Sequence, residues 1–348
     1  MKKVALIGNY GVENRGDEMI LEGIINKHQE YSFLVFSCHP RITEKKFPTI
    51  KSCYPFALGL RSFFRRTFLE TLRNLKECDE VWIGGGGLFQ DDDLFAPFLW
   101  GWQFFWVKFL KKSLKIYSTS VGPLKRKISR SIVRKVHMYA KEISVRDESS
   151  KKALEGLGVQ KEKICIIPDP ALFANIPQTK PKERIFYSFA LRPTKYNKKL
   201  VIIIKKVFKE LLKHPDSEIL LISMQGKMDC DFYKEIIKDF NTPRLQTIHP
   251  KTNEEFLEQM QKSCISINLR LHASIGSFIT NTPFIALSYS QKVQSFFNTL
   301  GFAELVLTPN EWSFSNIMQK IKYIQSNYSE LQKAFSNKYK EVTSQEVQ

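Results

Sequence analysis

The sequence predicts an α/β protein built from two Rossmann-like domains that face a cleft. At 348 residues, the chain is too long for one ordinary hydrophobic core and suits two. Short apolar segments alternate with helical segments of about 10–15 residues, which implies parallel sheets with right-handed crossovers. A polar segment with two prolines, ANIPQTKPKER at 174–184, interrupts this alternation. We therefore predict an N-terminal domain at 1–175, a C-terminal domain at 184–310, and final helices with a tail at 311–348 that can cross back to the first domain.

In the first half, each short apolar segment is followed by a helical one. The opening segment, KVALIG at 3–8, follows two lysines, but its apolar run stops after about four residues, which is too short for a signal peptide. It is therefore interpreted as a first strand, and we expect the chain to stay in the cytoplasm. Strands are expected at 3–8, 32–37, 80–84, 114–118, 142–145 and 163–167, and helices at 17–27, 56–76, 94–110, 129–140 and 148–157.

The aromatic segment at 94–110 (LFAPFLWGWQFFWVKFL) resembles a membrane span in composition. It covers 17 residues and contains Lys108, whereas a span needs roughly 20 apolar residues. We interpret it as a core helix. The alternative is a partly exposed aromatic face that rests on lipid headgroups.

After the linker, the same alternation begins again. Apolar segments such as EILLIS at 218–223 and CISIN at 264–268 are bounded by polar residues, as expected for strands of a second sheet. Strands are expected at 185–190, 218–223, 264–268 and 284–288, and helices at 198–213, 230–240, 253–262, 273–280 and from 311 onward.

Charge and cysteine content restrict the classes of partner. The chain has 53 basic and 35 acidic residues, a net charge of +18, which favours anionic partners such as membrane surfaces and anionic substrates. No zinc finger, RNP motif or helix-turn-helix is recognisable, so we predict no nucleic-acid partner. The six cysteines are scattered without C-x-x-C spacing, which indicates neither a zinc site nor a disulfide framework.

Two glycine-rich turns follow predicted strands. In Gly8–Glu18 (GNYGVENRGDE), one interpretation is a tight turn whose Asp17 caps the next helix; the other places Asn14 and the helix N-terminus toward an acceptor or phosphate. In the second turn, Gly84 to Gly87, residues Gly86 and Gly87 would let the backbone approach a ligand.

Three aspartates, Asp91 to Asp93, follow the second turn. Their D-x-D spacing can hold a divalent metal ion beside a nucleotide, but consecutive aspartates are more often a solvated turn, and we predict no metal. Asp91 lies nearest the glycines, and we assign it a hydroxyl-positioning or general-base role.

Polar and cationic side chains follow four predicted strands of the second domain. Because parallel strands end at the same edge of a sheet, we expect these side chains to converge. Any one of them alone would more often be structural, yet together they suit an anion: guanidinium groups bind carboxylate and phosphate, and an imidazole moves protons near neutral pH. The residues are Arg192, Gln225, Arg270, His272, Tyr289 and Lys292.

Seven motifs occur in order along the chain. They are G-x-x-G-x-x-N-x-G-D-E at 8–18, G-G-G-G-L-F-Q-D at 84–91, V-G-P-L at 121–124, S-V-R-D-E at 144–148, D-P-A-L at 169–172, R-L-H at 270–272, and the lysine of S-Y-S-Q-K at 292. In this order they resemble the motifs of the polysaccharide pyruvyl transferase family, including its cell-wall-type members. The resemblance extends from about residue 3 to about residue 300.

The resemblance implies a glycosyltransferase-B-like fold, phosphoenolpyruvate as the donor, no cofactor, and a pyruvate ketal formed on a sugar. It implies a cell-surface polysaccharide or its lipid-linked precursor as the acceptor. By position, Arg192 and Arg270, with Leu271 between Arg270 and His272, match the donor-binding residues. His272 matches the proposed general acid, and Lys292 a further residue on the anion side. Ser290 stands where the family often has aspartate, a departure that concerns the role of this loop.

Two rival classes stay open. The main alternative is a nucleotide-sugar-dependent glycosyltransferase of the same fold, although the second domain lacks the acidic ribose signature E-x-x-x-x-x-x-E. The other is a non-catalytic lipid- or RNA-binding protein. An enzyme that acts on a lipid-linked sugar would benefit from the basic, aromatic surface at an anionic inner leaflet, so we also expect peripheral contact with the inner face of the membrane.

Overall fold

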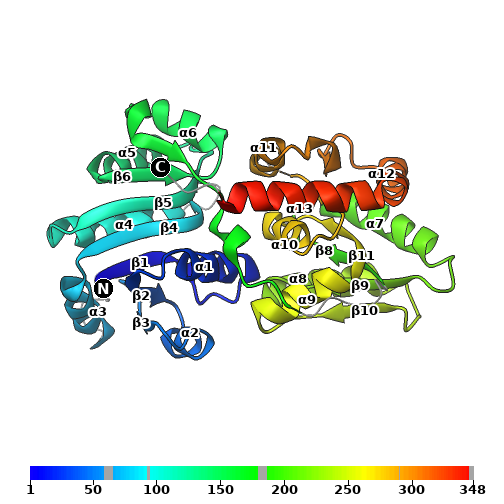
Figure 1. Ribbon diagram of the computed structural model, residues 1–348, viewed down its shortest axis with the longest axis horizontal. Helices are drawn as coiled ribbons and strands as arrows, with labels where there is room; N and C mark the ends of the chain where they lie inside the picture. The colour runs from blue at the N-terminus through cyan, green and yellow to red at the C-terminus, as the bar shows by residue number, and fades with distance from the viewer. Residues whose placement is uncertain (59–65, 92–94, 179–185, 290, 345–348) are drawn as a thin grey trace. The chain divides into compact units, whose positions relative to one another are not determined.

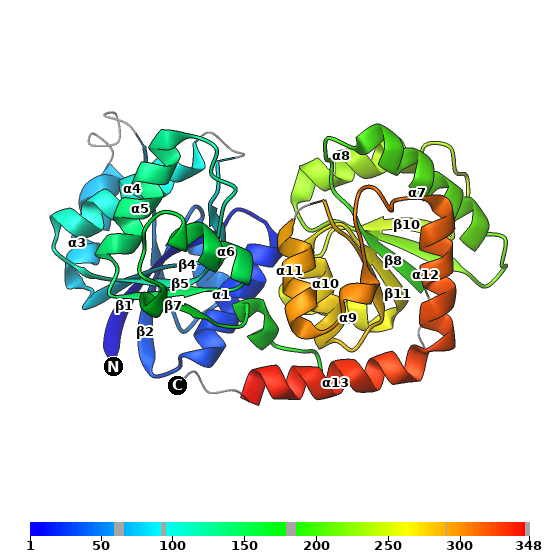
Figure 2. The same cartoon turned by 90° about the horizontal axis from the view of Figure 1, so that it is seen from above.

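The computed structural model describes residues 1–58, 66–91, 95–178, 186–289 and 291–344. Within these ranges, the side chains of Arg66, Gln291 and Lys292 are not described. The chain divides into two compact units (Figures 1 and 2). The first comprises Met1–Val12 and Ile20–Phe173, and the second comprises Glu13–Met19 and Ala174–Gln348. Residues 13–19 thus belong with the second unit, a placement that the predicted boundary at 175 did not anticipate.

The first unit is a seven-stranded parallel sheet with strand order β3-β2-β1-β4-β5-β6-β7. Its strands are β1 (Lys2–Tyr10), β2 (Tyr31–Ser37), β3 (Lys51–Cys53), β4 (Glu80–Phe89), β5 (Ser113–Val121), β6 (Glu142–Val145) and β7 (Ile164–Ile166). Its helices are α1 (Arg15–Lys27), which begins in the segment assigned to the second unit, α2 (Pro40–Lys46), α3 (Arg66–Glu77), α4 (Ala96–Phe109), α5 (Lys127–Tyr139), α6 (Glu148–Glu155) and the short η2 (Lys161–Lys163) and η3 (Pro170–Phe173).

The second unit is a six-stranded parallel sheet with strand order β10-β9-β8-β11-β12-β13. Its strands are β8 (Phe186–Ala190), β9 (Glu218–Ile222), β10 (Leu245–Ile248), β11 (Ser263–Asn268), β12 (Phe284–Leu287) and β13 (Val306–Leu307). Its helices are α7 (Asn197–Leu211), α8 (Gly226–Ile237), α9 (Asn253–Lys262), α10 (Leu271–Ile279), α11 (Gln291–Leu300), η4 (Ala303–Leu305), α12 (Phe314–Ser326) and α13 (Tyr328–Ser344). In this unit α13 packs along α10 (Figure 1).

Each sheet reverses its strand order at one point. In the first sheet the reversal lies between β1 and β4, and in the second it lies between β8 and β11. The residues that follow these strands stand at the topological switch point, where open α/β sheets bind ligands. The central strands β1 and β4 are apolar and mostly buried, as expected for parallel strands covered by helices on both faces.

Two predicted elements differ from the structure. Of the helix expected at 56–76, residues 59–65 lie outside the described ranges, and α3 covers Arg66–Glu77. Phe56 is not helical: its backbone exchanges hydrogen bonds with the amide of Gln103, from Phe56 N to Oε1 at 3.0 Å and from Nε2 to Phe56 O at 2.6 Å. The glycine turn at 84–87 is not a loop but the irregular end of β4, which runs to Phe89 and pairs with β5.

Close packing and backbone conformation account for glycine at several positions of β4. A Cβ on Gly84 would lie 2.3 Å from the carbonyl oxygen of Tyr117, and Gly85 adopts a positive φ of 76°. Gly86 also has a positive φ, 86°, at the point where the register with β5 shifts. This close contact and these conformations disfavour residues with a side chain, which explains Gly84, Gly85 and Gly86 without a ligand.

Two motifs of the first unit meet in a buried ion pair. Arg146 of S-V-R-D-E donates from Nη1 to Oδ2 of Asp169, which belongs to D-P-A-L, at 2.5 Å, and from Nε to Ser120 Oγ at 2.5 Å. Arg146 is 7 % exposed and Asp169 is fully buried. Since removing one partner of a buried pair leaves an uncompensated charge, both motifs have a structural role in holding β5, β6 and the turn after β7 together.

Acidification should destabilise the first unit through His137. This side chain is fully buried in α5 and donates from Nδ1 to Val133 O at 2.7 Å. Burial lowers the pKa of His137 from 6.5 to about 4, although the hydrogen bond to Val133 acts in the opposite direction. Between these values the unfolded chain binds a proton that the folded chain does not, so stability falls as pH falls. From pH 7 to pH 5 the loss should be about 2 kcal/mol.

Urea titrations at several pH values test this expectation. His137→Leu should lower stability at neutral pH but should remove this part of the pH dependence. An equal loss of unfolding free energy between pH 7 and pH 5 in wild type and variant would exclude His137 as the cause.

Candidate functional site

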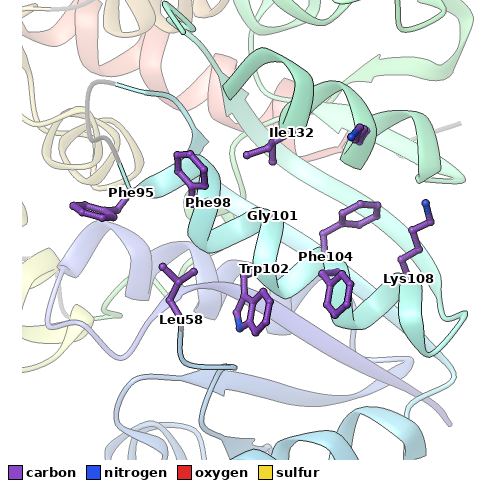
Figure 3. A pocket seen from close by; sticks show the side chains of 10 residues that line it. Leu58, Phe95, Phe98, Gly101, Trp102, Phe104, Lys108 and Ile132 are labelled. Atoms are coloured by element: carbon purple, nitrogen blue, oxygen red, sulfur yellow. The ribbon is translucent and has the colours of Figure 1, made fainter. Parts of the chain in front are cut away.

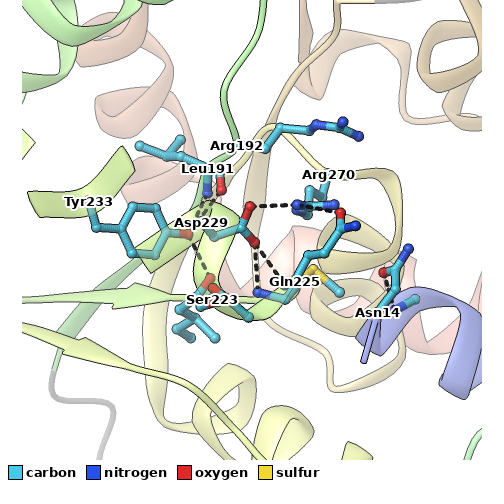
Figure 4. Close-up of polar contacts among 12 residues, drawn as sticks. Asn14, Leu191, Arg192, Ser223, Gln225, Asp229, Tyr233 and Arg270 are labelled. Atoms are coloured by element: carbon cyan, nitrogen blue, oxygen red, sulfur yellow. Dashed lines mark hydrogen bonds and ion pairs between the residues drawn. The ribbon is translucent and has the colours of Figure 1, made fainter. Parts of the chain in front are cut away.

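Polar side chains follow four strands of the second sheet where these strands end. Arg192 follows β8, Gln225 follows β9, Arg270 and His272 follow β11, and Tyr289 follows β12. Because β8 and β11 are the neighbours at which the strand order reverses, the two arginines stand on either side of the switch point. Figure 4 shows Arg192, Gln225 and Arg270 projecting from this edge. The edge therefore carries two guanidinium groups and one imidazole.

Asp229 fixes the guanidinium of Arg270. Arg270 precedes α10 and is 8 % exposed; its Nη2 donates to Asp229 Oδ1 at 2.5 Å and to Gln225 Oε1 at 3.1 Å (Figure 4). Asp229 is fully buried, and its Oδ2 accepts the backbone N–H groups of Met224 and Gln225 at 3.0 and 2.9 Å. A carboxylate with three donors compensates the buried guanidinium. The buried Nε–H of Arg270 has no acceptor among the described residues, so a donor stays unused.

Tyr233 holds the backbone that leads to Arg192. Its hydroxyl accepts the N–H of Leu191 at 3.0 Å and donates to the carbonyl of Ile222 at 2.8 Å, so it joins the ends of β8 and β9. Burial raises the pKa of Tyr233 well above its ordinary value of 10.0. The hydroxyl therefore stays protonated and keeps both bonds at physiological pH.

Arg192 lacks the carboxylate partner that Arg270 has. Its Nη1 donates to the hydroxyl of Tyr289 at 3.2 Å, and its guanidinium carbon lies 5.6 Å from the centroid of the Tyr289 ring. Within the described ranges no acidic side chain pairs with Arg192, and its buried Nε–H has no acceptor. A cation held by an aromatic ring but not neutralised is suited to bind an anionic ligand.

The segment 13–19 packs against the same edge. Asn14 forms an antiparallel bridge with Gln225, and Arg15 donates from its backbone N to Met224 O at 2.9 Å. The Arg15 side chain, 3 % exposed, donates from Nη1 to Lys251 O at 2.9 Å. Burial lowers the pKa of Arg15, and its Nε–H, like those of Arg192 and Arg270, has no acceptor in the described part of the chain.

The side chains of Asn14 and Asp17 stabilise the start of α1. Asn14 Oδ1 accepts the N–H of Gly16 at 3.1 Å, and its Nδ2 donates to Asp17 Oδ2 at 2.8 Å. The prediction that Asp17 is the helix cap is therefore wrong in its residue: Asn14 caps the first turn and Asp17 orients the Asn14 amide. This capping explains both side chains without a ligand.

His272 lies directly on Gly16. A Cβ built on Gly16 would stand 2.3 Å from Nδ1 and 2.6 Å from Cγ of the imidazole. His272 is in the first turn of α10 beside Leu271, the first residue of that helix. The ring therefore occupies the space that any side chain at position 16 would need. The G-D-E motif of α1 and the R-L-H motif of α10 thus contact each other through Gly16 and His272.

Three predicted site residues, Gly86, Gly87 and Asp91, lie in the first unit. The environment of Asp91 differs from the one that its predicted role requires. Asp91 is 1 % exposed, and its carboxylate accepts the N–H groups of Lys125 and Arg126 at 2.8 and 2.7 Å. Burial acts to raise the pKa of Asp91, but these backbone hydrogen bonds prevail and lower it. A buried carboxylate that anchors the turn before α5 is a poor general base, so the structure assigns Asp91 a structural role. Gly86 and Gly87 lie in β4, as described above.

Some predicted residues lie outside the described structure. Lys292 is in α11, but its side chain is not described, and Ser290, Asp92 and Asp93 fall outside the described ranges. In the ranges that are described, no group of three or more His, Cys, Asp and Glu side chains could hold a metal ion.

No site role is predicted from the sequence for Asp229, Tyr233 or Gly16. Asp229 lies in the first turn of α8, and its pairing with Arg270 spans 41 positions. Tyr233 is in the middle of α8, where an aromatic residue ordinarily belongs to the core. Gly16 belongs to the G-D-E motif, but its contact with His272 leaves no signal in the local sequence.

Comparison with solved structures shows a glycosyltransferase-B-like fold. HepE of Anabaena in complex with UDP-glucose has a TM-score of 0.66 at 12 % identity, over 99 % of this chain and 95 % of that one. The UDP-GlcNAc 2-epimerase of Neisseria meningitidis bound to UDP-GlcNAc has 0.64 at 14 %, over 97 % and 96 %. MnaA of S. aureus with UDP has 0.64 at 14 %, over 97 % and 92 %. At such identities the similarity establishes the fold alone.

Sequence comparison identifies the family. No curated protein matches the chain significantly. The family model for polysaccharide pyruvyl transferase matches residues 14–291, a range that begins at the Asn14 cap and includes Arg192, Arg270 and His272. The chain belongs to the polysaccharide pyruvyl transferase family.

Proposed function

We propose that the protein transfers a pyruvyl group from phosphoenolpyruvate to a sugar of a cell-surface polysaccharide or its lipid-linked precursor, forming a pyruvate ketal. The observation that carries this proposal is the placement of Arg192 and Arg270 on either side of the switch point between β8 and β11. Phosphoenolpyruvate has a carboxylate and a phosphate, and two guanidinium groups suit two such anionic groups.

The two arginines are suited to different tasks. Arg270 is held by Asp229 and Gln225, so it presents its unused donor without reorganisation. Arg192 carries a positive charge without a carboxylate partner among the described residues and is held only through Tyr289. A trianionic donor would neutralise that charge. Lys292, which follows β12 in sequence, is proposed as a further cation on this side.

His272 is proposed to donate the proton that starts the reaction. Its protonated imidazole would transfer a proton to the methylene carbon of phosphoenolpyruvate, leaving an oxocarbenium-like centre at C2. A first sugar hydroxyl attacks C2 and returns its proton to the imidazole. The oxygen of a second hydroxyl then displaces the phosphate, whose departure the arginines assist, and its proton is released. The products are the pyruvate ketal of the sugar, with the former methylene as its methyl group, and inorganic phosphate.

Thermal unfolding with and without phosphoenolpyruvate tests the donor assignment. At a hundredfold excess over Kd, the ligand should raise the melting temperature by about 5–10 °C. Arg192→Ala should abolish this shift, because the variant loses the cation that has no carboxylate partner among the described residues. Lys206→Ala, an exposed basic residue on α7 of the same unit, serves as the matched control and should respond like the wild type.

The alternative donor is a nucleotide sugar. The solved structures named above contain UDP or UDP-sugars, so UDP-glucose and UDP-GlcNAc are the decisive comparison ligands. A shift with one of these and none with phosphoenolpyruvate would overturn the proposal in favour of a nucleotide-sugar enzyme.

A further inference from the structure

Helix α4 of the first unit exposes an aromatic face. Phe98, Trp102, Phe105 and Phe109 recur at spacings of four, three and four residues, so they lie along one side of the helix. Phe105 is 48 % and Phe109 is 63 % exposed, and Phe95, just before the helix, is 65 % exposed. The opposite side supplies Trp100 and Val107 to the core, and Trp106 is buried beside the exposed rings of Phe105 and Phe109. Helix α4 therefore has one side in the core and another side that exposes aromatic rings.

A groove runs along this face between α4 and α5 (Figure 3). Its volume is about 740 Å³, and its walls include Leu58, Phe98, Trp102 and Ile132. The ring of Trp102 stacks on Phe105 with centroids 5.5 Å apart, and its Nε1 donates to Ala57 O at 3.0 Å. Lys108 and Lys135 are its charged lining residues. The groove is thus apolar inside, with ammonium groups at its border.

The stretch of chain that contains α4 and α5 is basic and has no acidic residues. From Phe95 to Lys141 the chain has 11 lysines and arginines and no aspartate or glutamate, so this stretch carries most of the net charge of +18. Lys127, Arg130, Arg134 and Lys135 of α5 are all exposed. Cations beside exposed aromatic rings match the headgroup region of an anionic bilayer, where rings enter the interface and lysines contact phosphate groups.

We propose that the α4–α5 face, comprising Phe95, Phe105, Phe109, Lys108 and the exposed basic residues of α5, is a docking surface for an anionic lipid bilayer. The aromatic rings enter the interface and the groove receives hydrocarbon chains. No helix in the described part of the chain is long and apolar enough to cross a membrane. This inference does not rest on the proposed function, because it concerns other residues and involves neither phosphoenolpyruvate nor a sugar.

Cosedimentation with vesicles of phosphatidylcholine, alone or mixed with phosphatidylglycerol, tests this surface. The full chain should bind the mixed vesicles at low salt and lose most binding at high salt. Each surface lysine contributes about fivefold, so Lys108→Gln with Lys135→Gln should weaken binding to the mixed vesicles about 25-fold. Phe105→Ser with Phe109→Ser should weaken it at least about tenfold.

Matched controls lie on α7 of the second unit. Lys206→Gln with Lys209→Gln changes two exposed lysines, and Ile202→Ser changes an apolar side chain that is 58 % exposed. Both variants should bind like the wild type.

Equal weakening in these controls would show that net charge or general hydrophobicity, not this face, governs binding. No preference for anionic vesicles would overturn the proposal. If light scattering shows a dimer that the phenylalanine variant alone dissociates, without vesicle binding, the face is instead an interface between copies of the chain.

Discussion

Replacing His272 with alanine should lower kcat by about 10²–10⁴-fold, the usual contribution of a general acid. The imidazole stands in the first turn of α10, two residues after Arg270, so a donor bound by the arginine would present its methylene carbon nearby. The effect should fall on the chemical step and leave donor binding largely intact. Single-turnover formation of the ketal would measure the rate, and the melting-temperature shift with phosphoenolpyruvate would measure binding.

These two measurements separate a role in chemistry from a role in binding. If His272→Ala loses the thermal response to phosphoenolpyruvate along with its activity, His272 is a binding residue and another group supplies the proton. If the variant keeps full activity, the proposed proton transfer is wrong. His272→Gln, which preserves hydrogen bonding but cannot donate a proton from a cationic ring, should be as impaired as the alanine variant.

Gly16→Ala should lower kcat about 10²-fold although residue 16 has no reactive group. Its Cβ would stand 2.3 Å from Nδ1 of His272, a distance that forces the imidazole to move. Misplacement of a catalytic group by about 1 Å can cost this much in rate. Alanine is a better helix former than glycine by about 1 kcal/mol, and residue 16 lies in the first turn of α1. The loss of rate should therefore not come with a loss of helix stability.

A double-mutant cycle gives the sharpest test of this contact. If Gly16 acts only through the imidazole, Gly16→Ala should have almost no effect in a His272→Ala background. Gly156→Ala is the matched control: Gly156 ends α6 in an ordinary helical conformation, and its Cβ would meet atoms no closer than 3.4 Å. A full additional loss in the double variant would mean that residue 16 affects the reaction by another route.

Hydrophobic patterning predicted most elements in their observed order, although the short strands β3, β10 and β13 and the helices α2 and α11 were not predicted. Strands such as Glu142–Val145 and helices such as Asn253–Lys262 were predicted with their observed bounds, because an apolar run or a helical period is a local property of the sequence. Phe56, predicted to start a helix, is not helical, since a side chain 47 residues away, Gln103, bonds its backbone. Such a contact leaves no local signal.

The features of the candidate site can be separated in the same way, into those that the sequence pattern predicts and those that depend on contacts between distant segments. Patterning in the sequence predicts that Arg192, Gln225, Arg270 and His272 follow strands of one sheet, because parallel strands bring such positions to one edge. The folded structure adds three contacts that the pattern does not show: Asp229 holds Arg270, Gly16 makes room for His272, and the backbone bonds Asp91, which is therefore not poised as a base. Hydrophobic patterning determines which positions share an edge, but the partners of a buried polar group depend on contacts between segments far apart in the chain.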